Sequence, residues 1–291
     1  MPSFRSLIFV PAINPRFVAK AKQLNADIIC FDLEDSVLPS EKVKARKMVQ
    51  HILRQRADYK FTKKVYVRIN SRESGISKID LRSTVQKGLD GIVVPKVNNK
   101  RELLELISLI NEIEERRQIK KNSVKLMPTV ETAEGVVNAY TIAAADQRIE
   151  AIIFGVYDFL YDMGLDYVED DPAGYSYARM KIPVDARAAG AMAIDAIWQK
   201  VDDISGLRND AVKAKRLGYA GKSIIHPNQI QTVHEVFRPS NSEIEWATKV
   251  LRVLGPGMRK GKGKGALKVE GKMIDAVHYK QAKSILEFAY D

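Results

Sequence analysis

Short apolar runs, rich in β-branched residues, alternate along the chain with longer segments of helical periodicity. The patterns predict strands at SLIFV (6–10), IICFD (28–32), VYVRI (65–69), GIVVP (91–95), VKLMPTV (124–130), AIIFGV (151–156), AMAIDA (191–196) and KSIIH (222–226). The clearest helix is predicted from Lys100 to Arg117, where leucine and isoleucine recur near helical spacing. Strands that are apolar throughout and alternate with helices indicate a parallel sheet whose outer face is covered.

Eight such strand–helix units predict the α/β class and a closed (β/α)8 TIM barrel. The alternative is a doubly wound open sheet, but no GxGxxG follows the first strand. A barrel of this kind typically takes about 250 residues, and the chain has 291. We therefore expect a catalytic barrel over residues 1–238 and a C-terminal arm or lid over residues 239–291.

The C-terminal part has a different pattern. Helices are expected near Pro227–Val236, over about 242–254 and over roughly 279–289. Within residues 255–275, the glycine- and lysine-rich part (259–265) is expected to form a mobile loop, because alternating glycine and lysine cannot bury enough surface to become ordered. The lysines of RKGKGK (259–264) could attract nucleotide phosphates or could be a solvated surface run.

Composition narrows the class of protein. The chain is 45% hydrophobic and 29% charged, and it has no apolar run near the ~20 residues that span a bilayer. The SLIFVPA segment (6–12) is too short for a secretory signal, and the lone Cys30 excludes a disulfide framework. We therefore expect a cytoplasmic protein that does not associate with membranes.

The net charge of +11 has three interpretations: a basic surface without specific function, attraction of a phosphate-rich ligand, or nucleic-acid binding. The basic residues are spread along the whole chain, without zinc-finger spacing or an RNP-type aromatic motif. This distribution disfavours nucleic acid as a partner.

Polar residues follow seven of the predicted strands. In chain order they are Asp32, Glu34 and Asp35, then Arg68 and Asn70, then Lys96, Glu131, Asp158, Asp195 and His226. In a barrel the carboxyl ends of the strands form one mouth, where active sites are built. We therefore expect these side chains to meet there.

Glu131 and Asp158 are the candidate metal ligands, because Mg²⁺ prefers oxygen ligands and often takes only one or two carboxylates. The alternative for Glu131 is an acidic residue that stabilises a helix N-terminus. Arg68 could bind a substrate carboxylate through two parallel hydrogen bonds. Its alternative is a structural ion pair with Asp32, Glu34 and Asp35. His226 could be a strand-end capping group rather than a ligand.

Eight segments together resemble the citrate lyase β-subunit-like family of the HpcH/HpaI aldolase superfamily. They are RSLIFVPA (5–12), DLEDSV (32–37) with Lys42 and Arg46, VRIN (67–70), PK (95–96), ETAEGVVN (131–138), FGVYDFLYDMG (154–164), LGYAGKSIIHPNQI (217–230) and GKMID (271–275). The likeness is strongest to the stand-alone malyl-CoA and citramalyl-CoA lyases. It implies a Mg²⁺-dependent carbon–carbon lyase that cleaves or condenses a short 2-hydroxy-acid coenzyme A (CoA) thioester.

The resemblance also implies roles for individual residues. Glu131 and Asp158 would hold Mg²⁺, with Arg68 on the carboxylate of the oxo acid. Asp275 would be delivered by the C-terminal arm to a neighbouring subunit and would exchange a proton with the enolate carbon of the acyl-CoA. Glu34 and Asp35 would orient metal-bound waters and Arg68. Arg5, and Lys96 at the mouth, would contact the substrate, Arg5 at the CoA phosphates. An arm that completes a neighbour's site implies a homotrimer or hexamer.

Two departures from the family pattern concern this chain. Val156-Tyr157 precede Asp158 where the family often has an acidic residue, and Val277 stands where a proline commonly follows MID. The first could reshape the acyl pocket and the second could loosen the turn of the lid. The alternative functions are a citrate lyase β subunit acting on a carrier-protein thioester, a malyl-CoA thioesterase, and a non-catalytic barrel that binds RNA or protein.

Overall fold

A computed structural model describes residues 4–56, 63–168, 172–259, 267–269 and 271–290. Eight parallel strands close into a barrel in the order β1 to β8, so that each strand pairs with its neighbours in sequence and β8 pairs with β1. The strands are β1 (Ser6–Pro11), β2 (Ile28–Asp32), β3 (Lys64–Arg68), β4 (Gly91–Val94), β5 (Lys125–Val130), β6 (Ala151–Phe154), β7 (Met192–Asp195) and β8 (Gly221–Ile224). The predicted TIM barrel and all eight strands are confirmed.

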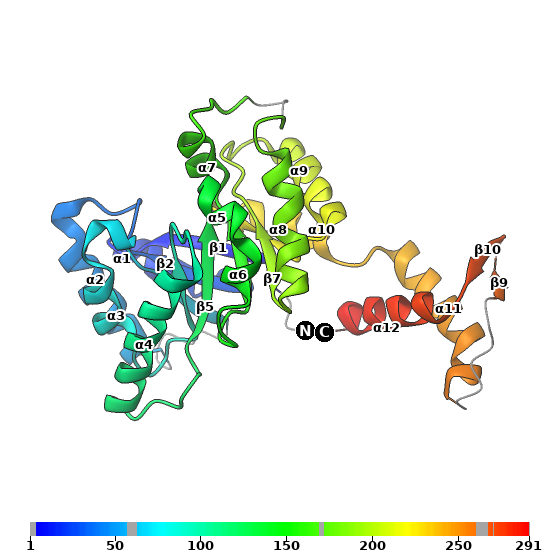
Figure 1. Cartoon of the computed structure of the whole chain (residues 1–291), viewed down its shortest axis with the longest axis horizontal. Coiled ribbons are helices and arrows are strands. Elements are labelled where there is room, and N and C mark those ends of the chain that lie inside the picture. Colours follow the sequence, from blue (N-terminus) through cyan, green and yellow to red (C-terminus); the bar gives the residue numbers. More distant parts are fainter. Residues whose placement is uncertain (1–3, 57–62, 169–171, 260–266, 270, 291) are drawn as a thin grey trace. The chain divides into compact units, whose positions relative to one another are not determined.

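Helices connect successive strands and lie around the barrel (Figure 1). They are α1 (Pro15–Ala21), α2 (Lys42–Arg54), α3 (Ser77–Thr84), α4 (Lys100–Arg116), α5 (Ala133–Val137), α6 (Ala139–Ala143), α7 (Val156–Asp162), α8 (Ser176–Ala188), α9 (Ile204–Leu217) and α10 (Gln229–Phe237). Helix α4 begins where Asn99 caps the Glu102 amide, and its buried face carries Leu103, Ile107 and Ile110. This is the helix that the apolar spacing predicts most clearly.

The barrel is filled by side chains from alternate positions of its strands. The core cluster includes Ile28 and Cys30 on β2, Tyr66 on β3, Met127 on β5 and Ile194 on β7, all fully buried. Because successive strand residues point to opposite faces, the residues two positions further along each strand also point inward. This alternation decides which strand-end side chains reach the mouth.

The chain divides into two compact units, Phe4–His234 and a second that continues from Glu235 to the C-terminus. The second unit contains α11 (Asn241–Arg259), α12 (Ala276–Tyr290) and an antiparallel hairpin of β9 (Leu267–Val269) and β10 (Lys272–Ile274). Partly buried residues such as Trp246 and Leu267 pack against its core. The core itself is made by five buried residues: Ala247, Val250, Leu254, Ile274 and Ala282.

Parts of residues 255–275 on either side of the glycine- and lysine-rich loop are helix and strand. Helix α11 continues to Arg259, and residues 267–269 and 272–274 pair as strands. Glycine and lysine dominate this stretch, yet Ile274 is 2% exposed and packs in the core of the unit. Tertiary packing thus orders a segment that its composition alone would leave open. Most of the RKGKGK run falls in 260–266, outside the described residues.

Within the described part of the chain, no helix combines the length and hydrophobicity needed to cross a membrane.

Candidate functional site

Three charged residues reach the mouth because strand alternation directs them inward. Asp32 ends β2 two residues after Cys30, and Arg68 ends β3 two residues after Tyr66. Glu131 follows the last residue of β5, in register with the inward-facing Met127. Asp32 and Glu131 are buried. The predicted convergence at the carboxyl ends of the strands is therefore confirmed for these three.

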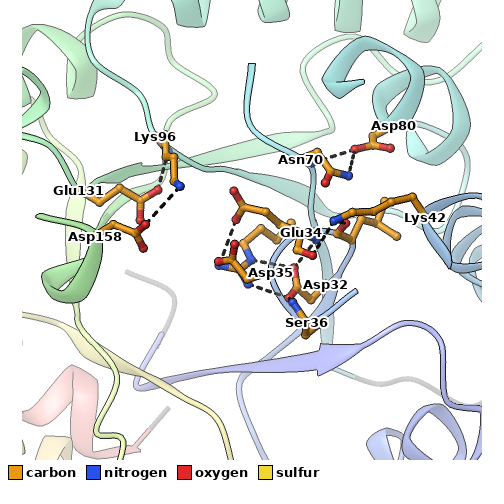
Figure 2. A network of polar contacts seen from close by, with 12 residues as sticks. Asp32, Glu34, Asp35, Ser36, Lys42, Asn70, Asp80, Lys96, Glu131 and Asp158 are labelled. Atoms are coloured by element: carbon orange, nitrogen blue, oxygen red, sulfur yellow. Dashed lines mark hydrogen bonds and ion pairs between the residues drawn. The ribbon is translucent and has the colours of Figure 1, made fainter. Parts of the chain in front are cut away.

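Glu131 and Asp158 both contact Lys96, Glu131 through the backbone amide and Asp158 through the ammonium group (Figure 2). The backbone N–H of Lys96 donates to Oε1 of Glu131 at 2.7 Å, and its Nζ lies 3.2 Å from Oδ1 of Asp158. Lys96 has a φ of 52°, a left-handed conformation that is costly for a residue with a side chain. In this conformation Lys96 contacts both candidate metal ligands, Glu131 with its backbone and Asp158 with its side chain.

The environment of Glu131 disfavours a bare carboxylate. Burial, and then the nearby Asp158, raise the pKa of Glu131 to about 7. Gly155, just after β6, makes room for this side chain: a Cβ at Gly155 would lie 2.3 Å from Oε2 of Glu131. The chain thus omits a side chain at this position so that a buried acid can stand beside a second acid. That arrangement suits a bound cation.

Arg68 makes the ion pairs that were the alternative to substrate binding. Its Nε and Nη2 each donate to one carboxylate oxygen of Asp32 at 2.7 Å. Its Nη1 lies 3.2 Å from Glu34 and from Asp35, and its guanidinium stacks 4.6 Å from the ring centre of Phe9. Asp32 therefore occupies one edge of the guanidinium and fixes its plane. The edge formed by Nη1 and Nη2 is the one that could grip a substrate carboxylate.

Glu34 is the most perturbed acid of the cluster. Burial raises the pKa of Glu34 to about 9, against the opposing effect of Arg68 and with the help of Asp35, Glu131 and Asp32. By contrast, Arg68 overcomes burial and holds the pKa of Asp32 below its usual range. Near neutral pH Glu34 is therefore protonated and Asp32 is ionised. The guanidinium then faces the ionised carboxylate of Asp32.

Two basic residues of α2 support this cluster from behind. Lys42 Nζ donates to the carbonyl oxygens of Leu33 and Glu34, at 2.8 and 2.6 Å. Arg46 pairs with the fully buried Asp80 at 2.9 Å, and Asp80 in turn accepts from the backbone and side-chain amides of Asn70. The side chain of Asn70 is thus bound to Asp80 in a structural network and does not join the acidic cluster around Arg68. Nothing in the spacing of the sequence signals Asp80, because it lies on a helix ten residues from its partner.

Three further residues of the sequence analysis are Arg5, Asp195 and His226. Arg5 precedes β1 and therefore stands at the amino-terminal end of the barrel, opposite the mouth, where it forms a two-pronged ion pair with Asp27. Asp195 follows the inward-facing Ile194 and so points outward, away from the barrel core. His226 lies in the loop after β8, where its Nδ1 is 2.7 Å from Oδ1 of Asn228. The expectation that Asp195 meets the mouth is wrong, and the place of Arg5 gives no support to its predicted contact with the CoA phosphates.

Asp275 belongs to the second unit. It stands between β10 and α12, its side chain is 48% exposed, and its Oδ1 accepts from the backbone amides of Val277 and His278. Hydrogen bonds from His278 and from the Val277 amide lower the pKa of Asp275. It is therefore an ionised, accessible carboxylate at a helix start.

The charges at the mouth do not balance. Two cations, Arg68 and Lys96, face five carboxyl groups, those of Asp32, Glu34, Asp35, Glu131 and Asp158. Within the described residues, no set of three or more His, Cys, Asp or Glu side chains could hold a metal by itself. Mg²⁺ needs fewer protein ligands than that, because it keeps waters and takes substrate oxygens. The donors Glu131 and Asp158 fit such a site.

Known proteins resemble this chain along nearly its whole length. The sequence matches the HpcH/HpaI aldolase/citrate lyase family over residues 5–227. It is 34% identical over 287 residues to the citrate lyase subunit beta of Haemophilus influenzae, covering 98% of this chain and 96% of that protein. Identity to the (3S)-malyl-CoA thioesterase of Cereibacter sphaeroides is 31% over 283 residues, covering 97% and 93%. Identity to the mitochondrial citramalyl-CoA lyase of Mus musculus is 31% over 295 residues, covering 98% and 86%.

The fold agrees with these matches. The crystal structure of the protein CitE from Mycobacterium tuberculosis, in complex with magnesium, acetoacetate and coenzyme A, superposes with a TM-score of 0.77. The two chains are 27% identical, and the match covers 99% of each. On both the family match and the full-length identities, this chain belongs to the HpcH/HpaI aldolase/citrate lyase family.

Proposed function

We propose that this protein is a Mg²⁺-dependent carbon–carbon lyase that cleaves, or in reverse condenses, a short 2-hydroxy-acid CoA thioester. The products of cleavage are an acyl-CoA and a 2-oxo acid, as from citramalyl-CoA or malyl-CoA. The observation that carries the proposal is the carboxylate pair Glu131 and Asp158, set across the mouth from the aligned guanidinium of Arg68. A mitochondrial citramalyl-CoA lyase among the relatives supports the reaction class.

Glu131 and Asp158 would hold the Mg²⁺. When bound, the ion supplies Lewis-acid chemistry, lowering the pKa of a hydroxyl and stabilising negative charge on oxygen. The magnesium-containing structure of the Mycobacterium tuberculosis relative supports this choice of ion. The excess of carboxyl groups at the mouth supports it independently, because burial of unpaired carboxylates is costly.

Arg68 would bind the carboxylate of the 2-oxo acid portion through its Nη1–Nη2 edge. Asp32 holds the opposite edge, so the guanidinium cannot rotate, and a substrate bound to it is held in one orientation. Glu34 and Asp35, both beside Nη1, would complete the catalytic group by positioning Arg68 and ordering water. Lys96 adds a second cation for the substrate, 31% exposed at the mouth.

Asp275 would exchange the proton at the carbon of the acyl-CoA. In cleavage, the enolate carbon takes a proton from Asp275, and the π electron pair of the enolate forms the new C–H bond. In condensation, the carboxylate removes that proton. We assign this role to Asp275 from a neighbouring subunit, which makes the protein a homo-oligomer, either a trimer or a hexamer. The domain division we propose, a barrel over 1–238 and an arm over 239–291, serves this exchange. We place the protein in the cytoplasm, in keeping with its buried single cysteine, Cys30.

Two other reactions use the same set of residues. A thioesterase would admit water to the thioester, as the name of the Cereibacter sphaeroides relative implies for that protein. The second alternative is the reaction of a citrate lyase β subunit. One of the relatives, from Haemophilus influenzae, has this name, and the match covers 96% of that protein. Such a subunit would need a carrier-protein thioester and partner subunits.

The deciding experiment incubates the pure protein with citramalyl-CoA, malyl-CoA and citryl-CoA, each with Mg²⁺ or EDTA, and traps 2-oxo acids as hydrazones. We expect Mg²⁺-dependent release of pyruvate, glyoxylate or oxaloacetate, and loss of release with EDTA. Free CoA with an intact hydroxy acid would replace the lyase by a thioesterase. Inactivity on all three CoA thioesters, with activity on a citryl carrier protein, would replace it by the citrate lyase subunit.

A further inference from the structure

The carboxylate of Asp275 has one anchored oxygen and one open oxygen. Oδ1 accepts from the backbone amide of Val277 at 2.9 Å and from that of His278 at 3.4 Å, and His278 Nδ1 lies 2.8 Å from it. In the described part of the chain, the hydrogen bonds and ion pairs of this carboxylate all go to Oδ1. Oδ2 is therefore the oxygen free to carry a proton.

His278 is itself held in place by the second unit. Its ring meets the ring of Trp246 on α11 nearly edge-on, with centroids 6.4 Å apart. Trp246 packs against the core of the unit, and so does Ile274, the residue before Asp275. The imidazole is thus fixed from α11, and the backbone of Asp275 is fixed by the buried residue before it and the helix after it. Two independent contacts therefore set the direction of the carboxylate.

The hydrogen bond of His278 depends on its tautomer. With a proton on Nδ1, the imidazole donates to Oδ1 of Asp275; without it, Nδ1 can accept from the backbone N–H of Asp275, 3.2 Å away. In either form the ring remains against the same residue. The usual role of such a residue, three positions after a helix cap, is to stabilise the start of the helix. That role alone would not require the capping carboxylate to be exposed.

The side chain of Asp275 is, however, 48% exposed, and the residues two positions before and after it in the sequence, Met273 and Val277, are exposed apolar side chains. A carboxylate that only caps a helix has no need of an apolar surround. An acid that must exchange a proton with carbon gains from one, because contact with the substrate then excludes water. The exposure of Asp275 and of its apolar sequence neighbours thus suits the role that the proposed function gives it.

We propose that His278 is a positioning residue, which holds Oδ1 of Asp275 so that Oδ2 points outward and exchanges the proton with the acyl-CoA carbon. This inference rests on the proposed function. In cleavage Asp275 first takes up a proton from solvent at Oδ2; this O–H bond then breaks as a C–H bond forms at the enolate carbon, which leaves Asp275 as the carboxylate again. In condensation the same proton moves from carbon to Oδ2. His278 neither gains nor loses a proton in this step and touches no reacting atom.

The test compares His278→Ala, His278→Asn and Lys280→Ala, the last an exposed residue on the same helix as the matched control. Each full-length variant is assayed for kcat and KM with the thioester that the wild type cleaves. Each is also assayed for deuterium uptake from D2O into the acyl-CoA product in the presence of the 2-oxo acid. Thermal unfolding of each variant reports the loss of the helix cap separately.

We expect His278→Ala to lower kcat and the rate of deuterium uptake about tenfold, the size of one lost hydrogen bond to a charged group. KM should stay within about twofold, because His278 does not contact substrate. His278→Asn, whose side-chain amide can donate to Oδ1, should recover most of both rates. It should do so even if its unfolding temperature equals that of His278→Ala. Lys280→Ala should match the wild type.

Wild-type rates in His278→Ala, with Asp275→Ala inactive, would overturn the positioning role and leave the proposed function intact. Loss of kcat in proportion to the fall in unfolding temperature, with no recovery in His278→Asn, would overturn it in favour of a helix cap alone. Absence of cleavage by the wild type and by Lys280→Ala would overturn both the proposed function and this inference.

Discussion

Two clusters of charged residues at the barrel strands differ in how their charges are matched. On the outside of the barrel, Asp195 and Lys222, partners in the register of β7 and β8, join Arg179 of α8 and Asp210 of α9. Two cations meet two carboxylates, and the side chains are at most 15% exposed. At the mouth, five carboxyl groups meet two cations, and the exposure of Asp35 reaches 61%.

In the outer cluster each charged side chain is paired with side chains of opposite charge. Lys222 Nζ lies 2.7 Å from Asp195 and 2.5 Å from Asp210, and Arg179 contacts both carboxylates. Burial opposes ionisation of Asp210, but Lys222 and Arg179 outweigh it and lower the pKa of that carboxyl. Such a cluster joins two helices to two strands and has no unmet charge with which to bind a ligand.

The mouth cluster is unbalanced, and its imbalance appears as raised pKa values at Glu34 and Glu131. Each raised pKa marks a carboxyl group that would be stabilised by a further cation. The comparison shows that a count of charged residues near strand ends does not locate a site. The excess of one sign of charge, open to solvent, does locate it.

The largest expected effect comes from neutralising a metal ligand. Glu131→Gln should lower Mg²⁺-dependent turnover roughly 10³-fold, because a bound metal contributes several kcal/mol of charge stabilisation. Isothermal titration with Mg²⁺ should show lost binding, and circular dichroism should show an intact fold, since the change removes a buried charge. Unchanged Mg²⁺ affinity would mean that the excess of carboxyl groups at the mouth serves another purpose.

The outer cluster should respond in the opposite way. Asp195→Ala leaves Lys222 and Arg179 with a single carboxylate, and breaking a buried ion pair costs about 3–5 kcal/mol in the free energy of unfolding. Urea unfolding measures this loss, and kcat of the folded fraction should stay within about twofold of the wild type. A variant that unfolds normally but loses activity would show that the outer cluster belongs to the site after all.

An effect of intermediate size is expected in the pH dependence of the free energy of unfolding, to which Glu131 of the mouth cluster contributes. The pKa of Glu131 is about 7 in the folded state against 4.5 as the reference, so folding favours its protonated form. This stabilisation is fully present below pH 4.5 and is lost as the pH rises through 7, up to about 3 kcal/mol in metal-free protein. Urea unfolding of the wild type minus Glu131→Gln, at pH 5 and pH 8, measures it.

Mg²⁺ should reverse this loss at pH 8, because the ion binds the ionised carboxylate and stabilises the folded state. It should have little effect at pH 5, where Glu131 holds a proton. A difference between the two proteins that does not change with pH would contradict the raised pKa of Glu131.

The smallest effect is expected at Arg5. Arg5→Ala breaks the ion pair with Asp27 at the amino-terminal end of the barrel and should cost about 1 kcal/mol of stability, as for a partly exposed pair. KM for the CoA thioester should be unchanged, because Arg5 lies opposite the mouth. An increase of KM by tenfold or more would restore the predicted contact with the CoA phosphates.

Much of the fold was predictable because its signals are local. Each barrel strand is a short apolar run between polar segments, and each run appears in the sequence within one or two residues of its final bounds. The hairpin of the second unit was not, since its strands have three residues each and are ordered by contacts with α11 and α12. The sequence pattern predicts no strand there.

The candidate site was predictable in its residue types and only partly in its geometry. Glu131, Asp158 and Lys96 follow strands in the sequence and contact one another in the structure, through Lys96. Asp195 stands at a strand end too, yet it faces outward, because Ile194 takes the inward position of β7. One residue of alternation separates a site residue from a structural one, and the sequence does not show which face is inside.

The sequence by itself determined the order of strands and helices, the closed parallel barrel and the set of acidic and basic residues that follow the strands. These follow from periodicity and chain order, which are properties of neighbouring residues. Tertiary structure alone decided that Asp32 aligns Arg68, that the absence of a side chain at Gly155 leaves room for Glu131, and that Arg5 pairs with Asp27. Those facts depend on which side chains share a space, and burial in that shared space sets the charge each carries.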